Sequence, residues 1–412
     1  MMKFNMALLL VLLWLPFMTT AQWTTATLPD GRSEISSVSV GDNIYFIGGG
    51  TSGIQRYFKM NIYHVPTASW TTVDVPNGTL GPRTITIDNK IYFGDIEGDR
   101  TIYIYSIDSS TWEELAVPGF IGTLTYMDRM LIVEDRGDLM LYDIDNQTWT
   151  EFDFPSQSGA TVTATNGKIA IGGGYPNLVR IYDVAAGTWS ESALSVQRSE
   201  PRSVSWENKM FFIGGDTSGT TLGSSPRIDI YDTETNTWSI DNMSKARSRF
   251  DVTIHNDKLI IAGGQIFSFS SQWRKEVDIL DLNSNVWETF QMPTGRRYPS
   301  VIGHHDKIYI AGGDADEDNL DIIEILTLET SAVHEISVPQ SSIYPNPVVD
   351  NVTLASEYMV YCVEIFDIQG RRVDLVNNLY GYKHKLDISS LGPGIYSLTT
   401  NHGQEQLMLL KQ

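Results

Sequence analysis

The sequence predicts an all-β protein, in which a seven-bladed β-propeller is followed by a small C-terminal β-sandwich. Three observations lead to this expectation. One unit of strands and turns recurs every 39 to 49 residues as far as about residue 338. No segment of this region keeps a 3.6-residue apolar period long enough for a helix. After Pro339 the chain changes to strand-like runs separated by Gly, Asn and Pro.

The first half of each unit is a hairpin turn and a short apolar run that ends near a Gly-Gly pair or its replacement. Turn residues such as Asp42-Asn43 tolerate the left-handed backbone that two-residue hairpins require. Apolar runs such as residues 44–47 suit strands buried on both faces, so we expect them to be the inner strands of the blades. Units two and three have Asp95-Ile96 and Glu134-Asp135 in place of Gly-Gly. The units align on Gly48, Asp95, Glu134, Gly173, Gly214, Gly263 and Gly312.

The second half of each unit carries an aromatic pair, in which a tyrosine, or Leu280 in unit six, precedes a tryptophan by seven residues. A large aromatic side chain at one fixed position per unit predicts packing between blades. A ligand-binding platform is the alternative, but every unit has the residue. The tryptophans are Trp70, Trp112, Trp149, Trp189, Trp238 and Trp287.

The two ends of the repeat region predict a closed ring. The seventh unit has Leu326 and Val333 where the others have the aromatic pair, whereas WTTATLP at Trp23 is close to WTTVDVP at Trp70. We infer that the N-terminal strand completes the last blade, which would hide the sheet edges of an open array. The alternative is that residues 333–338 complete it.

The recurring apolar run with Gly-Gly, then Tyr, then Trp resembles the repeats of the kelch family of β-propellers over residues 22–338. Kelch proteins typically carry an arginine sixteen residues before the first glycine of the pair. These arginines could pin loops through carbonyl groups, or they could reach a ligand. They are Arg32, Arg198, Arg247 and Arg296.

On the family pattern, the position two residues beyond this arginine also approaches the mouth of the ring. Arginine there suits a carboxylate, and aromatic rings suit a sugar face. We expect a glycan or protein ligand at Glu34, Glu200, Arg249 and Tyr298, with Arg198 and Arg247 nearby. The full set at this position is Glu34, Gly81, Phe120, Gly159, Glu200, Arg249 and Tyr298.

Two other functions stay open. Some bacterial kelch propellers that the chain resembles are sialic acid mutarotases, which implies a sugar mutarotase or isomerase with Glu34 or Glu200 as acid/base. A structural or adhesive part of a surface assembly is the third hypothesis. We expect binding without catalysis, and therefore assign no catalytic residue.

No cofactor or metal is expected. The copper oxidases among kelch-like propellers need a cysteine-linked tyrosine, and the only cysteine, Cys362, lies in the C-terminal module. The acidic residues 314–319 alternate as in a calcium loop, but the run has no glycine at the sixth place and no glutamate at the twelfth. A solvated blade loop is the simpler interpretation.

Residues 341–412 closely resemble the C-terminal sorting domain of the Bacteroidota type IX secretion system. The resemblance rests on Tyr344-Pro345-Asn346-Pro347, residues 363–371, 386–391 and 394–396, and the basic end at Lys411. It implies the type IX machinery as a partner, and passage through the periplasm to the cell surface or medium. In that family the module is usually removed on export or exchanged for a surface anchor.

The start of the chain and its charge agree with export. Residues 1–21, with Lys3, an apolar run and Ala21, predict a signal peptide rather than a membrane anchor, leaving Gln22 first in the mature chain. No later segment is apolar enough to cross a membrane. The net charge of −21 argues against nucleic-acid binding. We expect the mature protein to be a monomer.

Overall fold

The computed structural model describes residues 22–51, 55–79, 81–94, 100–217, 223–266, 272–315, 318–328, 341–368, 371–400 and 405–412. The chain divides into two compact units, Met1–Leu328 and Glu329–Gln412. The expected signal peptide lies outside the described residues, and so do residues 333–338, the alternative closing strand. Where the structure is described, no helix has the length and hydrophobicity needed to span a membrane.

The first unit consists of seven antiparallel sheets, each with four main strands, which we number as blades 1 to 7. The short 3-10 helix η1 (Val65–Thr67) joins β5 to β6. From the innermost to the outermost strand, blade 1 has β2 (Ser36–Val40), β3 (Asn43–Ile47), β5 (Gln55–His64) and β6 (Ser69–Thr79); blade 2 has β7 (Arg83–Ile87), β8 (Lys90–Gly94), β9 (Thr101–Ser106) and β10 (Thr111–Ala116); blade 3 has β11 (Thr123–Met127), β12 (Met130–Asp135), β13 (Asp138–Asp143) and β14 (Thr148–Phe152); blade 4 has β15 (Ser158–Thr165), β16 (Lys168–Tyr175), β17 (Leu178–Asp183) and β18 (Thr188–Ser192). In the same order, blade 5 has β19 (Arg202–Trp206), β20 (Lys209–Ile213), β21 (Arg227–Asp232) and β22 (Thr237–Asn242); blade 6 has β23 (Asp251–His255), β24 (Lys258–Ala262), β27 (Glu276–Asp281) and β28 (Val286–Gln291); blade 7 has β29 (Ser300–His304), β30 (Lys307–Ala311), β33 (Ile322–Thr327) and β1 (Gln22–Thr27).

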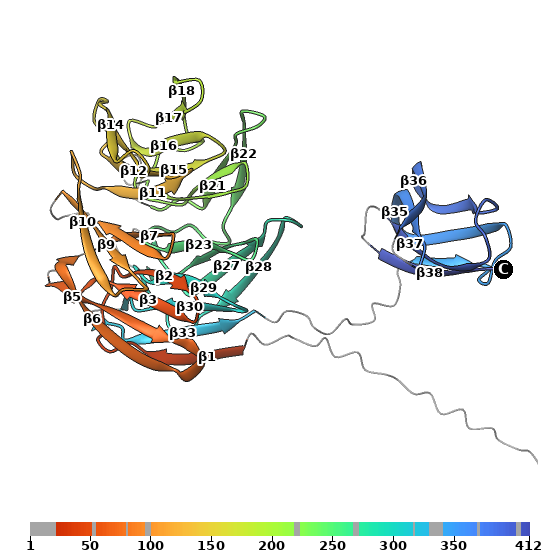
Figure 1. Cartoon of the computed structure of the whole chain (residues 1–412), viewed down its shortest axis with the longest axis horizontal. Coiled ribbons are helices and arrows are strands. Elements are labelled where there is room, and N and C mark those ends of the chain that lie inside the picture. Colours follow the sequence, from red (N-terminus) through yellow and green to blue (C-terminus); the bar gives the residue numbers. More distant parts are fainter. Residues whose placement is uncertain are drawn as a thin grey trace, which may run out of the picture. The chain divides into compact units, whose positions relative to one another are not determined.

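These sheets form a closed ring. The innermost strands of neighbouring blades lie against each other all the way round, including β29 of blade 7 against β2 of blade 1. In Figure 1 the labelled innermost strands gather towards the middle, and outermost strands such as β6, β14, β22 and β1 lie around the outside. This arrangement is the predicted propeller.

The N-terminal strand β1 closes the ring by pairing with β33, so the expected closure is confirmed. Trp23 lies opposite Leu326 in this pair, in the same register in which Trp70 lies opposite Tyr63 in blade 1. Trp23 is therefore the tryptophan that the seventh unit lacks in the linear sequence.

Hydrophobic packing joins each blade to the next, as the recurring tryptophans predicted. One buried cluster, for example, combines Ile47 of blade 1 with Ile91 and Phe93 of blade 2, and Trp112 packs against it. The Tyr–Trp pairs stack across the two outer strands, with ring centroids 4.8 Å apart for Tyr105 and Trp112. Each pair therefore covers the outer end of an interface between blades.

Two expectations about the repeat need correction. The all-apolar runs form the second strand of each blade and not the innermost one, because the second strand has a paired strand on both sides and is buried between neighbouring blades. In blade 3, Thr123 lies opposite Glu134 as Ser36 lies opposite Ile47 in blade 1. Since Ile47 precedes Gly48, the residue equivalent to this glycine is Asp135 rather than Glu134.

The second unit is a small β structure made of β34 (Ser341–Tyr344), β35 (Asn351–Phe366), β36 (Arg372–Asp387), β37 (Gly394–Thr400) and β38 (Glu405–Lys411). The first half of β35 pairs with β34 and its last residues pair with β37, while β36 follows it with register shifts. Such irregularities let a long strand pair bend. The strands enclose one core that includes Val352, Leu354, Ile365, Leu398 and Leu409.

Candidate functional site

The predicted mouth residues share a left-handed backbone at the start of their blades. The φ angles are 56° for Glu34, 50° for Glu200, 56° for Arg249 and 50° for Tyr298. Gly81 and Gly159 occupy the same position in blades 2 and 4, with φ of 59° and 77°. A side chain in this conformation costs about 1 kcal/mol or more relative to glycine. Four blades therefore keep a side chain where glycine fits best.

Backbone hydrogen bonds join these bends from blade to blade. The Glu200 amide donates to the carbonyl of Gly159 at 2.8 Å, and the Tyr298 amide donates to the carbonyl of Arg249 at 2.7 Å. The Glu34 amide then donates to the carbonyl of Tyr298 at 3.2 Å, across the junction of blades 7 and 1. The structure thus brings Arg249, Tyr298 and Glu34 next to one another along the rim of the mouth.

Blade 3 contributes Ile121 to this rim and not Phe120, because the register of that blade is shifted by one residue. Ile121 is 1% exposed, whereas Phe120 is 53% exposed beside the Arg100 guanidinium, 4.6 Å from its ring. The expectation for Phe120 was therefore wrong by one position.

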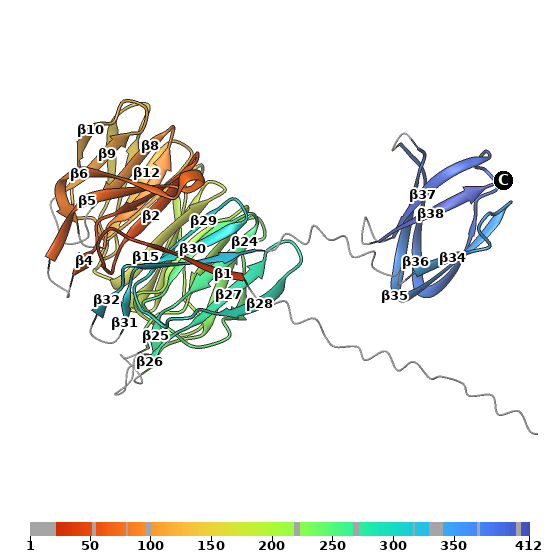
Figure 2. The same ribbon diagram turned by 90° about the horizontal axis from the view of Figure 1, so that it is seen from below.

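Loops between the second and third strands flank the mouth on the same side of the ring. Asp216 and Gln265 form isolated bridges with Ser199 and Ser248, the residues that precede Glu200 and Arg249. Extra strands extend this side in three blades: β4 (Gly50–Thr51), β25 (Gln265–Ile266) with β26 (Gln272–Trp273), and β31 (Asp314–Ala315) with β32 (Asp318–Asn319). Figure 2 shows β4, β25, β26, β31 and β32 on one side of the propeller.

Charged residues that the sequence analysis missed lie deeper, at the first positions of three innermost strands. These residues are Arg83, Arg202 and Asp251. Burial lowers the pKa of Arg83 to about 10, with repulsion from Arg202, while Asp251, Glu34 and Glu200 oppose the shift. Charges from blades 1, 2, 5 and 6 therefore act on one another across the ring. Each of these three residues stands two positions after a mouth residue, and none of them recurs in every blade. This lack of recurrence is the sequence feature that could have identified them.

Aromatic rings and guanidinium groups alternate beside the mouth in blades 6 and 7. The Arg249 guanidinium lies 5.4 Å from the Tyr298 ring centroid, and that of Arg297 lies 5.6 Å from the same ring and 4.9 Å from Trp273. Burial foremost raises the pKa of Tyr298, so its phenol keeps its proton at neutral pH. These contacts hold the rings and provide both apolar faces and hydrogen-bond donors.

The recurring arginines are buried inside the blades and have no exposed surface. Arg198 Nη2 lies 2.6 Å from Asp229 Oδ2, and Arg247 forms the same pair with Asp278. Other groups of these arginines donate to main-chain carbonyls, as Arg32 Nε does to Gly48 O at 2.9 Å. This geometry supports loop pinning, and it does not bring Arg198 or Arg247 to the surface of the mouth.

The structure also bears on metal binding. Among the residues it describes, no group of three or more His, Cys, Asp or Glu side chains is placed to hold a metal ion. Two residues of the acidic run, 316 and 317, lie outside that part of the chain.

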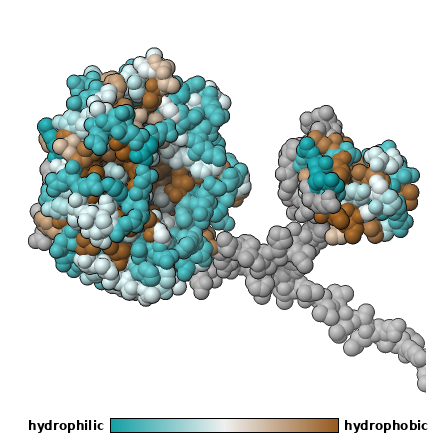
Figure 3. Space-filling view, viewed as in Figure 1, coloured by the Kyte–Doolittle hydropathy of each residue, from teal (hydrophilic) through white to brown (hydrophobic). Residues whose placement is uncertain are grey.

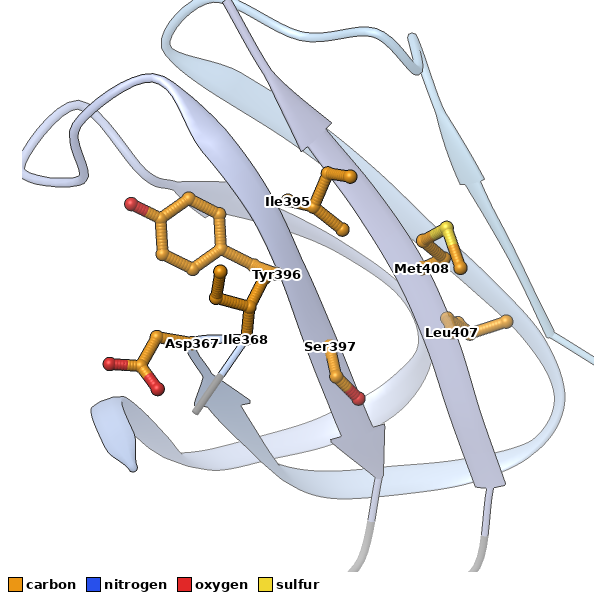
Figure 4. A pocket seen from close by; sticks show the side chains of 7 residues that line it. All are labelled: Asp367, Ile368, Ile395, Tyr396, Ser397, Leu407 and Met408. Carbon is orange, nitrogen blue, oxygen red and sulfur yellow. The ribbon is translucent and has the colours of Figure 1, made fainter. Parts of the chain in front are cut away.

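The second unit has an apolar face that is separate from its core. A cavity of about 350 Å³ is lined by Asp367, Ile368, Ile395, Tyr396, Ser397, Leu407 and Met408. Figure 4 shows Ile368 beside the Tyr396 ring, with Leu407 and Met408 on the neighbouring strand. Ile368 is 80% exposed and Met408 71%, and Ile395 and Leu410 are also exposed. We call these four residues the β37–β38 face; Figure 3 shows hydrophobic surface over these strands.

Comparisons with known proteins agree with both units. Residues 132–313 match the family described as KLHDC2/KLHL20/DRC7 Kelch-repeats domain, and residues 342–410 match the Secretion system C-terminal sorting domain. No curated protein matches the chain. The solved structure titled "Structure of YjhT" is 13% identical, with a TM-score of 0.46, over 74% of this chain and 97% of that one. The sorting domain indicates export to the cell surface or extracellular space. The chain is a secreted kelch-type protein, with a kelch-repeat β-propeller followed by a type IX C-terminal sorting domain.

Proposed function

We propose that the propeller is a monomeric, non-catalytic binding module that recognises an extracellular glycan or protein through the mouth of its ring. The observation that carries the proposal is the set of left-handed bends at the mouth. A residue that only shaped the bend would be glycine, as it is in blades 2 and 4. Two of these four residues are glutamates and the others are an arginine and a tyrosine, so no single shared scaffold role accounts for the set.

The chemistry of these side chains suits a polar ligand with an apolar face. Carboxylates accept hydrogen bonds from hydroxyl or amide groups, and a guanidinium donates them. The Tyr298 ring, held beside Arg249, offers a flat surface for stacking. A mutarotase or isomerase with Glu34 or Glu200 as acid/base is the alternative use of the same residues.

The test compares two glutamates of blade 5 with the same backbone. Glu200 at the mouth and Glu207 in the hairpin turn after β19 are both exposed, with φ of 50° and 49°. Glycine relieves the bend at either position, so neither substitution threatens the fold. The exported full chain is applied to printed arrays of glycans and extracellular proteins.

We expect at least one ligand to bind the parent and Glu207→Gly proteins but not the Glu200→Gly protein. Binding that survives both substitutions would rule out the mouth as the site, as would the absence of any ligand. Conversion of a bound sugar between its anomers by the parent chain, lost in Glu200→Gln with binding retained, would favour the enzyme.

We propose that the type IX machinery takes the chain from the periplasm and contacts the β37–β38 face of the sorting domain. An exposed apolar surface suits burial against a partner, and the match to the sorting family supports the identity of that partner. Met408→Glu should leave the domain folded but reduce the amount of protein in the medium or at the surface. Lys385→Glu, which is exposed on β36 outside this face, is the control. Equal secretion of both variants would contradict the assignment.

A further inference from the structure

A buried carboxylate at the mouth lacks a partner for one of its oxygens. Asp216 is 7% exposed, and its Oδ1 has no hydrogen-bond partner in the described part of the chain. Its backbone is fixed by two hydrogen bonds of 2.8 Å with Ser199, the residue before Glu200. A buried acceptor of this kind costs free energy until something donates to it. The position of Asp216 beside the mouth makes a bound ligand the natural donor.

The equivalent positions in the next two blades are satisfied. In blade 6, the side-chain oxygen of Gln265 accepts from Arg297 Nη1 at 3.3 Å. In blade 7, Asp314 Oδ2 accepts from Arg297 Nε, also at 3.3 Å. One arginine between the blades thus serves both residues. In blade 5, by contrast, the Asp216 carboxylate has no such arginine for its Oδ1 among the described residues.

The neighbours of Asp216 define which ligand group fits. Asp216 bridges Ser199, which precedes Glu200, and Ser224. The Ser224 hydroxyl lies 3.3 Å from that of Ser248, which precedes Arg249. Burial raises the pKa of Asp216, Arg249 opposes this shift, and Glu200 adds to it. An anionic ligand group would be repelled by the two carboxylates, and a cationic one, although attracted by them, would offer no acceptor to the Arg249 guanidinium. An uncharged hydroxyl group donates to a carboxylate and accepts from a guanidinium, so it meets no repulsion.

The Tyr298 ring adds the second element of such a site. It lies 5.4 Å from the Arg249 guanidinium and belongs to the next blade along the rim. An aromatic face beside paired acceptors and donors suits a sugar ring, whose C–H face stacks while its hydroxyl groups bond sideways.

We infer that Glu200, Asp216, Arg249 and Tyr298 form a subsite for an uncharged sugar residue, with Asp216 Oδ1 accepting from one of its hydroxyl groups. This inference rests on the proposed binding function and narrows its ligand from glycan or protein to a neutral glycan. Asp216 is then the residue that decides specificity, although the linear sequence gives it no distinction from other loop acids.

The experiment measures binding of neutral sugars to the exported full chain by calorimetry. The probes are oligosaccharides of glucose, galactose and mannose, with glucuronic acid and glucosamine oligomers as charged counterparts. Asp216→Asn keeps the shape but replaces one acceptor oxygen by a donor amide. Asp257→Asn, in the hairpin turn after β23, is the matched control because it is exposed and tolerates asparagine at its φ of 55°.

We expect at least one neutral sugar to bind, with a loss of tenfold or more in Asp216→Asn and no change in Asp257→Asn. The charged oligomers should bind more weakly than the neutral ones. Tyr298→Gly removes the aromatic ring and relieves the left-handed bend, so it should weaken binding of the same sugar. This variant replaces Asp216→Asn in the test if Asp216→Asn fails to fold. Thermal unfolding of each variant confirms that it is folded.

The outcomes separate this inference from the proposed function. If neutral sugars bind equally to the parent and Asp216→Asn proteins, or if none binds, the sugar subsite is overturned. If the parent protein nevertheless binds an arrayed protein or charged glycan and Glu200→Gly does not, the binding function of the mouth stands without the sugar subsite. If no ligand of any class depends on Glu200, both are overturned.

Discussion

The ring has two sectors that differ in sequence and in structure. Blades 5, 6, 7 and 1, the loop-rich sector, have the Gly-Gly pair, a buried arginine and a side chain at the mouth. Blades 2, 3 and 4, the plain sector, present Gly81, Ile121 and Gly159 at the mouth and have no arginine at the buried position. The strand framework is the same in both sectors. The difference is therefore in the loops and in what holds them.

The buried side chain acts as a staple for the loop between the second and third strands. In blade 7, Arg296 Nη1 donates to Gly312 O at 3.0 Å, where the loop leaves β30, and to Ile322 O at 3.2 Å, where it returns. In blade 4, the Gln157 amide bonds Gly173 O and Leu178 O in the same way. A neutral staple serves the short loop of blade 4, whereas the charged staples Arg198, Arg247 and Arg296 of the longer loops also pair with a buried carboxylate.

The largest effect should come from removing a charged staple. Arg247→Met leaves Asp278 buried without its ion-pair partner, and we expect a loss of about 3–5 kcal/mol in the free energy of unfolding. Gln157→Met in the plain sector removes two hydrogen bonds to carbonyls and the acceptor of Arg180 Nη1, but no ion pair, at a cost of about 1–3 kcal/mol. Denaturant unfolding measures both. Arg247→Met with Asp278→Leu should recover most of the loss, and equal losses for the two single variants would contradict the distinction between the sectors.

The plain sector contains a buried carboxyl group, Glu134, that should make the stability of the protein depend on pH. This side chain is 2% exposed, and burial foremost raises its pKa to about 7. The unfolded chain releases this proton near pH 4.5, so the stability contributed here falls as the pH rises from about 4.5 to 7 and is level above that. The total is about 3 kcal/mol.

Glu134→Gln removes this titration and should make the protein more stable than the parent at pH 8, with the difference vanishing near pH 4. Denaturant unfolding at several pH values measures the effect. If the difference in unfolding free energy between the parent and Glu134→Gln proteins does not change with pH, Glu134 is already ionised at low pH.

Adding a side chain at a mouth glycine of the plain sector should affect stability differently from removing a side chain at the mouth of the loop-rich sector. In the plain sector, Gly159→Ala places a Cβ 2.8 Å from Ser199 Cβ at a φ of 77°. We expect a loss of about 1–3 kcal/mol from the backbone strain and the close contact. Thermal unfolding measures it, and an unchanged melting temperature would show that the rim can shift to make room.

The smallest effect is expected for the reverse change in the loop-rich sector. Glu200→Gly relieves the left-handed bend but adds freedom to the unfolded chain, so its stability should stay within about 1 kcal/mol of the parent. A larger loss would mean that the Glu200 side chain supports the fold and that its place at the mouth is structural.

The repeat pattern predicted the fold because each blade must solve the same packing problem. The tryptophans identified the outer strands, and the similarity around Trp23 identified the closing strand. The register failed in blade 3, where no Gly-Gly pair marks the end of the second strand, and the error moved the mouth residue from Ile121 to Phe120.

The candidate site was predicted in part for the same reason. Glu34, Glu200, Arg249 and Tyr298 stand at a position that the repeat defines. Asp216 and Arg83 do not stand out, because an acid in a loop and an arginine at a strand start are common on any surface. Their importance comes from burial and from neighbours in other blades, which a linear sequence does not display.

The closing strand makes synthesis through β33 a condition for a finished propeller. The six residues of β1 are synthesised first among the blades, yet their partner β33 begins only at Ile322. A chain that stops early therefore keeps an open sheet edge in blade 7 and an unpartnered Trp23. Open edges invite aggregation and cleavage. The ring thus contains its own check for truncation within the propeller, since only a chain that extends through β33 can pair its first strand.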